Sequence, residues 1–211
     1  MPELPHNGAV NEGEPIAVPA QAATLPAPAP GFSRVGLGLQ FVVLVIAILG
    51  GFLGILGSLV AEIQRGGGFV LGPIIIAAPV IEEAMKPAGV YISLIKWPQA
   101  LRSPLHIAVL CALGGLVFGL VESWVYVNVY VDNPTDEFIR FRYTVPVAMH
   151  VVCSFVFGWG VNRSIIDWAA GKGRIAGRTK RAYISAVVIH GLYNFMAIVL
   201  SVAGLLSFDE E

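Results

Sequence analysis

Charged residues are scarce in this 211-residue chain, and neither sign is in excess. They make up 13% of the sequence, with 13 Lys and Arg against 14 Asp and Glu, while 56% of the residues are hydrophobic. So few charges are unlike the surface of a soluble domain, and the lack of a basic excess argues against a nucleic-acid partner. The composition indicates a polytopic membrane protein in contact with the lipid bilayer.

Cysteine is also scarce, and short alternating segments are missing. Cys111 and Cys153 fall within apolar segments rather than in a loop, so a disulfide framework is not expected. Segments of about 10 residues with period-two alternation would indicate a transmembrane β-barrel, and none is found. We therefore expect an all-α fold, a bundle of transmembrane helices.

Five apolar segments are long enough to cross a hydrocarbon core of about 30 Å, which requires about 20 helical residues. They run approximately from Val35 to Ile63, Phe69 to Ile95, Leu105 to Tyr130, Tyr143 to Trp168 and Ala182 to Leu206. Pro73, Pro79 and Pro87 remove backbone donors from the second span and predict a kink or break in it. We expect residues 34–208 to form the membrane domain, and the Pro- and Ala-rich residues 1–33 to be a disordered tail.

Lysine and arginine are divided unequally between the two sides of such a bundle. One side holds Arg34, Lys96, Arg102, Lys172, Arg174, Arg178, Lys180 and Arg181, and the other holds Arg65, Arg140 and Arg142. The positive-inside bias therefore predicts a cytoplasmic N-terminus in the cell membrane. With an odd number of spans, the C-terminus is then expected outside.

The few polar and ionisable groups within the predicted spans recur at helical spacing. They are Glu82, Glu83 and Lys86 in the second span, Glu122 in the third, His150 in the fourth, and His190 and Asn194 in the fifth. A charged side chain at the bilayer centre costs about 2.5–3.5 kcal/mol on insertion scales, and such groups usually face a cavity. Their number indicates a functional site rather than helix packing.

Several protease chemistries are excluded by what this set lacks. The chain has no H-E-x-x-H sequence and no pair of aspartates within the spans. Cys153 and Ser154 follow His150 closely, but nothing nearby marks either as an activated nucleophile. The remaining chemistry is activation of water, by a buried glutamate or by a metal that His and Glu side chains hold. Both mechanisms use the same residues.

Three short motifs lie in order along the last four spans. Residues 82–86 read EEAMK, or EExxK; residues 118–122 read FGLVE, or FxxxE; and residues 190–194 read HGLYN, or HxxxN. Together they resemble the PrsW family of intramembrane proteases, which is related to the CAAX prenyl endopeptidases and their bacterial Abi relatives. The resemblance covers roughly Phe69 to Leu206. The last motif of the family usually ends in Asp, whereas Asn194 stands here.

The resemblance implies a membrane protease that cuts membrane-anchored proteins, such as anti-sigma factors, on the extracytoplasmic side. Our topology agrees, since His150 and Glu122 are expected about 7 and 8 residues inside the outer ends of their spans.

Roles for the site residues follow from the resemblance together with their chemistry. Glu83 or Glu82 would polarise the attacking water while Lys86 holds the other carboxylate. Glu122 and His150 would complete the water or metal site, and His190 and Asn194 would stabilise the oxyanion. In a competing version a zinc-like divalent ion is bound, with Glu122, His150 and His190 as its expected ligands.

Two other functions stay open on the sequence alone. A non-catalytic membrane scaffold or assembly subunit would need no chemistry, although the adjacent Glu82 and Glu83 argue against it. An ion-coupled transporter would use the buried Glu, Lys and His side chains as a relay. Five spans without an evident inverted repeat make that reading less attractive.

Overall fold

The computed structural model describes residues 35–65 and 73–203, which contain helices and no strand. Four helices are long and apolar enough to cross a membrane: α1 (Leu37–Arg65), α4 (Pro104–Val125) with its π-helical extension η3 (Tyr126–Tyr130), α5 (Asp136–Gly160) and α7 (Gly177–Val202). The shorter η2 (Pro98–Ala100) and α6 (Ser164–Ala169) lie in connections. The expected all-α transmembrane bundle is confirmed, whereas the predicted tail 1–33 lies outside the described residues.

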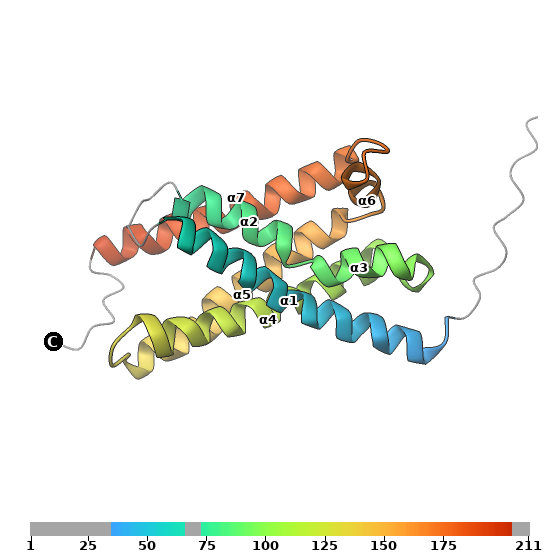
Figure 1. Cartoon of the computed structure of the whole chain (residues 1–211). Coiled ribbons are helices and arrows are strands. Elements are labelled where there is room, and N and C mark those ends of the chain that lie inside the picture. The colour runs from blue at the N-terminus through green and yellow to red at the C-terminus, as the bar shows by residue number, and fades with distance from the viewer. Residues whose placement is uncertain (1–34, 66–72, 204–211) are drawn as a thin grey trace, which may run out of the picture. The chain divides into compact units, whose positions relative to one another are not determined.

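The second predicted span is a series of short helices rather than one (Figure 1). It consists of the π-helical turn η1 (Pro73–Ala77), α2 (Ala78–Met85) and α3 (Ala88–Lys96). The break falls at Pro87, which has no amide proton to continue the helical hydrogen bonds. Next to it, the Tyr91 hydroxyl donates to the Ala84 carbonyl at 3.1 Å. The break predicted in this span is thus confirmed, and among the described residues the bundle has four continuous spans beside this broken one.

Helix α5 begins at Asp136 rather than at Tyr143, where the fourth span was expected. The Thr135 side chain accepts a hydrogen bond from the Phe138 amide at 3.1 Å, and two acidic residues occupy the first turn, next to the positive end of the helix dipole. Because the first turns of this helix carry charged residues, apolar residues alone do not indicate where the helix starts. As a result His150 lies near the middle of a 25-residue helix, farther from the start of the helix than predicted.

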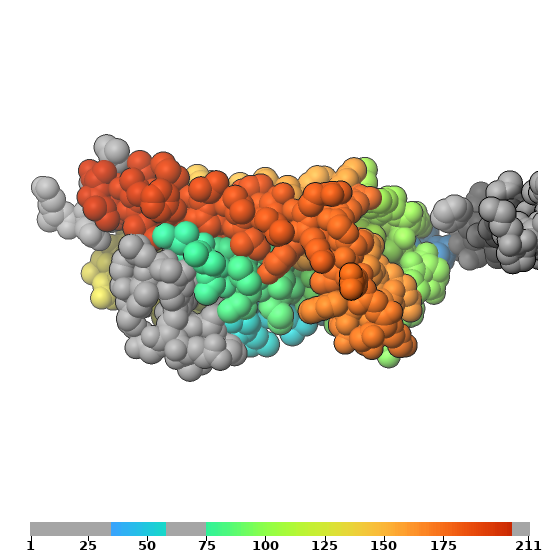
Figure 2. Space-filling view, turned by 90° about the horizontal axis from the view of Figure 1, so that it is seen from above, coloured from blue at the N-terminus to red at the C-terminus, as the bar shows by residue number. Residues whose placement is uncertain are grey.

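Glycines let the broken segment approach α1 closely. A Cβ atom on Gly89 of α3 would overlap the backbone of Ile46, and one on Gly50 would overlap the backbone of Gly89. Helix α2 packs against both α1 and α7, and Figure 2 shows its surface beside that of α7. Helices α4 and α5 pack along each other, with α1 against α4 and α7 against α5. Helix α2 is therefore held among the long spans.

We expect Gly89→Ala to destabilise the bundle, because the new methyl group would force α1 and α3 apart. Overpacking of this kind typically costs about 1–3 kcal/mol. The control is Gly38→Ala, because no atom lies within 4 Å of a Cβ at that position of α1. Thermal unfolding in detergent measures both variants. Equal melting temperatures for the two would contradict the close crossing.

Candidate active site

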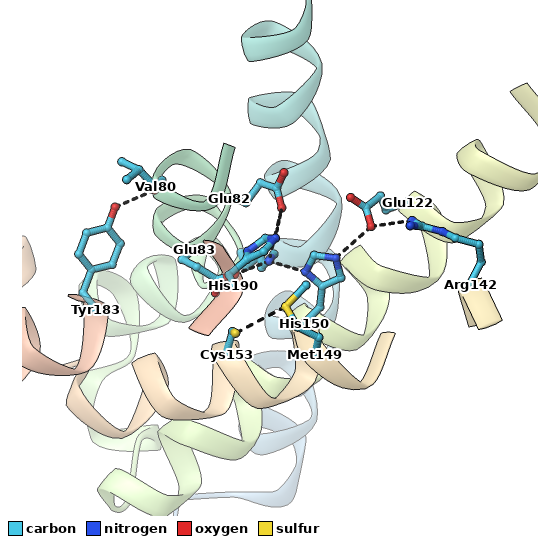
Figure 3. A network of polar contacts seen from close by, with 11 residues as sticks. Val80, Glu82, Glu83, Glu122, Arg142, Met149, His150, Cys153, Tyr183 and His190 are labelled. Atoms are coloured by element: carbon cyan, nitrogen blue, oxygen red, sulfur yellow. Dashed lines mark hydrogen bonds and ion pairs between the residues drawn. The ribbon is translucent and has the colours of Figure 1, made fainter. Parts of the chain in front are cut away.

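Four helices bring the predicted polar side chains, apart from Asn194, together in one largely buried cluster. In Figure 3 the rings of His150 and His190 lie close together, with Glu82 and Glu83 near His190 and Glu122 on the far side of His150. The ring centroids of the two histidines are 5.0 Å apart. Both histidines, with Glu83, are at most 1% exposed. The structure thus gathers residues from α2, α4, α5 and α7 that are far apart in the sequence. Glu83 and His190, for example, are separated by 107 positions.

Lys86 follows the last residue of α2 and is completely buried. Its Nζ atom is 2.6 Å from Glu83 Oε1, 2.7 Å from His150 Nδ1 and 3.7 Å from Glu82 Oε2. The ammonium group also lies 4.4 Å from the centroid of the Phe118 ring, a favourable position for a cation. Of the two adjacent carboxylates, Lys86 therefore holds Glu83 more closely.

His190 is oriented by the same carboxylate. Its Nδ1 atom is 2.8 Å from Glu83 Oε1, and since an ionised carboxylate only accepts hydrogen bonds, Nδ1 carries the proton. The lone pair of His190 is then on Nε2, which lies 3.7 Å from Glu82 Oε2. A histidine that binds a metal through one ring nitrogen commonly donates the N–H of its other ring nitrogen to a carboxylate.

Glu122 is bound on one oxygen by two side chains of α5. Its Oε2 atom lies 3.0 Å from Arg142 Nη2 and 3.0 Å from His150 Nε2. The guanidinium group stacks 3.8 Å from the centre of the Tyr126 ring, and Ser123 Oγ donates to the Arg142 carbonyl at 2.6 Å. Arg142 was not in the predicted site. The sequence feature that could have indicated Arg142 is its position eight residues before His150, on the same helical face.

Glu82 has the least occupied carboxylate of the pair on α2. Its Oε2 atom is buried without a hydrogen-bond partner, and its two charged neighbours, Lys86 and His190, lie 3.7 Å away. Glu83 Oε2 also lacks a partner, but Glu83 is already held through Oε1, which lies 2.6 Å from Lys86 and 2.8 Å from His190. Buried polar atoms are rarely left without a partner, so such an oxygen is a candidate for binding a ligand. The sequence left open whether Glu82 or Glu83 faces the reaction, and this geometry favours Glu82.

Three of these residues could hold a metal ion. Glu82, His150 and His190 each offer one ligand atom, and these atoms all lie within 4.8 Å of one another. Two His and one Glu, with a fourth position for water, is a known ligand set of catalytic zinc. The buried Glu82 oxygen without a partner is what a cation would satisfy. The donors fit a divalent metal, with Glu82 in place of the expected Glu122, which Arg142 and His150 already engage.

The other candidates take different positions. Asn194 is half-buried on α7, one turn after His190, as the HxxxN spacing requires. Cys153 Sγ contacts Met149 Sδ at 3.6 Å, and the buried Ser154 hydroxyl has no hydrogen-bond partner. Because no base accepts a hydrogen bond from the Ser154 hydroxyl, the structure supports the exclusion of a serine nucleophile.

A family model for PrsW family intramembrane metalloproteases matches residues 32–208, which include every helix described above. No match was found among curated proteins or among solved structures. The match covers the cluster and the four long spans that surround it.

We expect Glu83→Leu to destabilise the protein by about 3 kcal/mol, because it leaves Lys86 as a buried charge without its closest partner. The double variant Glu83→Leu with Lys86→Met should recover most of that loss, since it removes both charges. Chemical unfolding in detergent measures the free energy of unfolding. Glu137→Gln, an exposed carboxylate at the start of α5, is the control and should cost less than about 1 kcal/mol. A double variant as unstable as the single one would contradict the ion pair.

Proposed function

Because the chain belongs to the PrsW family of intramembrane metalloproteases, and is therefore a membrane protease, we propose that it hydrolyses peptide bonds of membrane-anchored proteins at the cluster of Glu82, His150 and His190. The observation that carries the proposal is the set of three buried ligand atoms within 4.8 Å, one of them an oxygen without a partner. The scaffold and transporter readings explain neither the family nor this arrangement of donors.

Glu82, His150 and His190 would hold the metal. When bound there, a divalent ion such as zinc supplies Lewis-acid activation of water and of the peptide carbonyl. Glu83 contributes by fixing the proton of His190 on Nδ1, which leaves Nε2 as the donor atom. The role of Glu83 is thus to orient, whereas that of Glu82 is to bind.

Glu122 is suited to proton transfer. A quarter of its side chain is exposed, compared with 8% for Glu82 and none for Glu83, so water and a substrate peptide reach it most easily. We assign it the role of general base, which takes a proton from the attacking water and returns it to the leaving amine. Arg142 fixes its orientation through Oε2.

The orientation of the chain supports cleavage toward the outer face. Figure 1 shows η1, α2 and α3 running back against the direction of α1, so the broken segment still returns the chain across the bundle. The charge bias then keeps the N-terminus in the cytoplasm and the C-terminus outside. The proposed substrates are membrane-anchored proteins of the anti-sigma-factor type, cut within the bilayer from its outer side.

Glu82→Gln should abolish cleavage, because the amide keeps the shape of the side chain but loses the anionic oxygen. We expect a loss of at least about 100-fold. The measurement maps the N-termini of membrane proteins in the native host at matched levels of wild type and variant. Glu137→Gln makes the same chemical change at an exposed position and should cleave as wild type does. If new N-termini near the outer face persist in the Glu82→Gln strain, this site does not perform the hydrolysis.

Asn194 tests the oxyanion site. If its amide donates to the developing oxyanion, Asn194→Ala and Asn194→Asp should both lower kcat by about 100-fold or more with little change in KM, because neither offers that donor. Turnover of a purified single-span substrate in nanodiscs gives both constants. The control is Asn128→Asp, whose exposed amide donates to the Trp124 carbonyl. A kcat for Asn194→Asp equal to that of wild type would show that no donor is needed there.

A further inference from the structure

His150 already uses both of its ring nitrogens. Nδ1 lies 2.7 Å from Lys86 Nζ, and Nε2 lies 3.0 Å from Glu122 Oε2. An ammonium group only donates hydrogen bonds, whereas an ionised carboxylate only accepts them. The lone pair of His150 is therefore on Nδ1, directed at Lys86, and its proton is on Nε2, directed at Glu122.

A metal ion would need the lone pair that Lys86 occupies. A metal on Nδ1 displaces Lys86 directly. A metal on Nε2 requires the single proton of the neutral ring to move to Nδ1, which then no longer accepts from an ammonium group. Either way the hydrogen bond between Lys86 and His150 has to break. His190 has no such conflict, because its Nε2 lone pair faces Glu82.

We propose that Lys86 is a built-in competitor of the metal: its ammonium group and the ion bind His150 alternately, so that metal loading switches Lys86 off His150. This inference rests on the metal site in the proposed function and adds its regulation. Without the ion, Lys86 compensates the buried carboxylates of Glu82 and Glu83 and keeps the cluster closed. With the ion, Lys86 keeps its 2.6 Å partner Glu83 and its place over the Phe118 ring.

The position of Lys86 allows such a switch. It immediately follows the last residue of α2, before the break at Pro87, and its charge is carried by a flexible four-carbon chain. The Nζ atom of Lys86 contacts two separate acceptors, Oε1 of Glu83 and Nδ1 of His150. Releasing the histidine therefore does not leave the ammonium group without a partner.

The test compares the Zn²⁺ affinity of the full-length protein in nanodiscs, measured by competition with a chromophoric chelator. Lys86→Met keeps the bulk of the side chain and frees the lone pair, so we expect it to bind Zn²⁺ at least about 10-fold more tightly than wild type. The matched control is Arg142→Met. It also removes a cation from the cluster, but one that contacts Glu122 rather than the His150 lone pair, so its affinity should rise far less.

An unchanged or weaker affinity of Lys86→Met, or an equal gain in Arg142→Met, would overturn the competition. A second measurement needs no variant at Lys86: ¹⁵N spectra of the metal-free wild type should show His150 protonated on Nε2 and His190 on Nδ1. A proton on Nδ1 of His150 would overturn the proposal even if Lys86→Met failed to fold. Neither measurement involves cleavage. A failure of the competition proposal can therefore be told apart from a failure of the proposed function, which the Glu82→Gln test would reveal.

Discussion

The ion pair between Lys86 and Glu83 holds the site together. Both side chains are completely buried, and neither charge would be stable alone at membrane depth. Glu83 also orients His190, and Lys86 contacts His150, which continues the network to Glu122. One pair on a short helix thereby sets the direction of both histidine rings, on α5 and α7.

That pair depends on the broken second span. Irregular backbone at membrane depth is tolerated where it is enclosed by protein or lines a cavity. Here α2 ends at Met85, Lys86 and Pro87 follow before α3 begins, and Gly50 and Gly89 bring α1 and α3 into backbone contact. The long helices supply the rigid frame, and the short ones carry the two carboxylates and the lysine that act together.

Much of this architecture follows from the sequence, because intramembrane charges are costly and therefore informative. The EExxK, FxxxE and HxxxN spacings identified residues that, apart from Asn194, the structure brings into one cluster, and the prolines identified the break. Phe118 stood in its motif without an assigned role, and the structure places its ring against both Lys86 and His150.

What the sequence left open depends on rotation about helix axes. Glu82 and Glu83 differ by about 100° around α2, so their roles follow only from where Lys86 and His190 lie in space. Whether Glu122 or Glu82 is the ligand was equally hidden, because the contact between Arg142 and Glu122 joins two helices and residues 20 positions apart. The start of α5 was missed because Thr135, Asp136 and Glu137 signal a helix by capping rather than by hydropathy.

The most direct test is the position of the metal itself. A zinc-loaded structure in lipid, with anomalous scattering recorded at the zinc edge, should show one peak bounded by Glu82, His150 and His190, with Lys86 on Glu83 and no longer on His150. A peak at another set of residues, or His150 still bonded to Lys86 in the loaded protein, would contradict this account of the site.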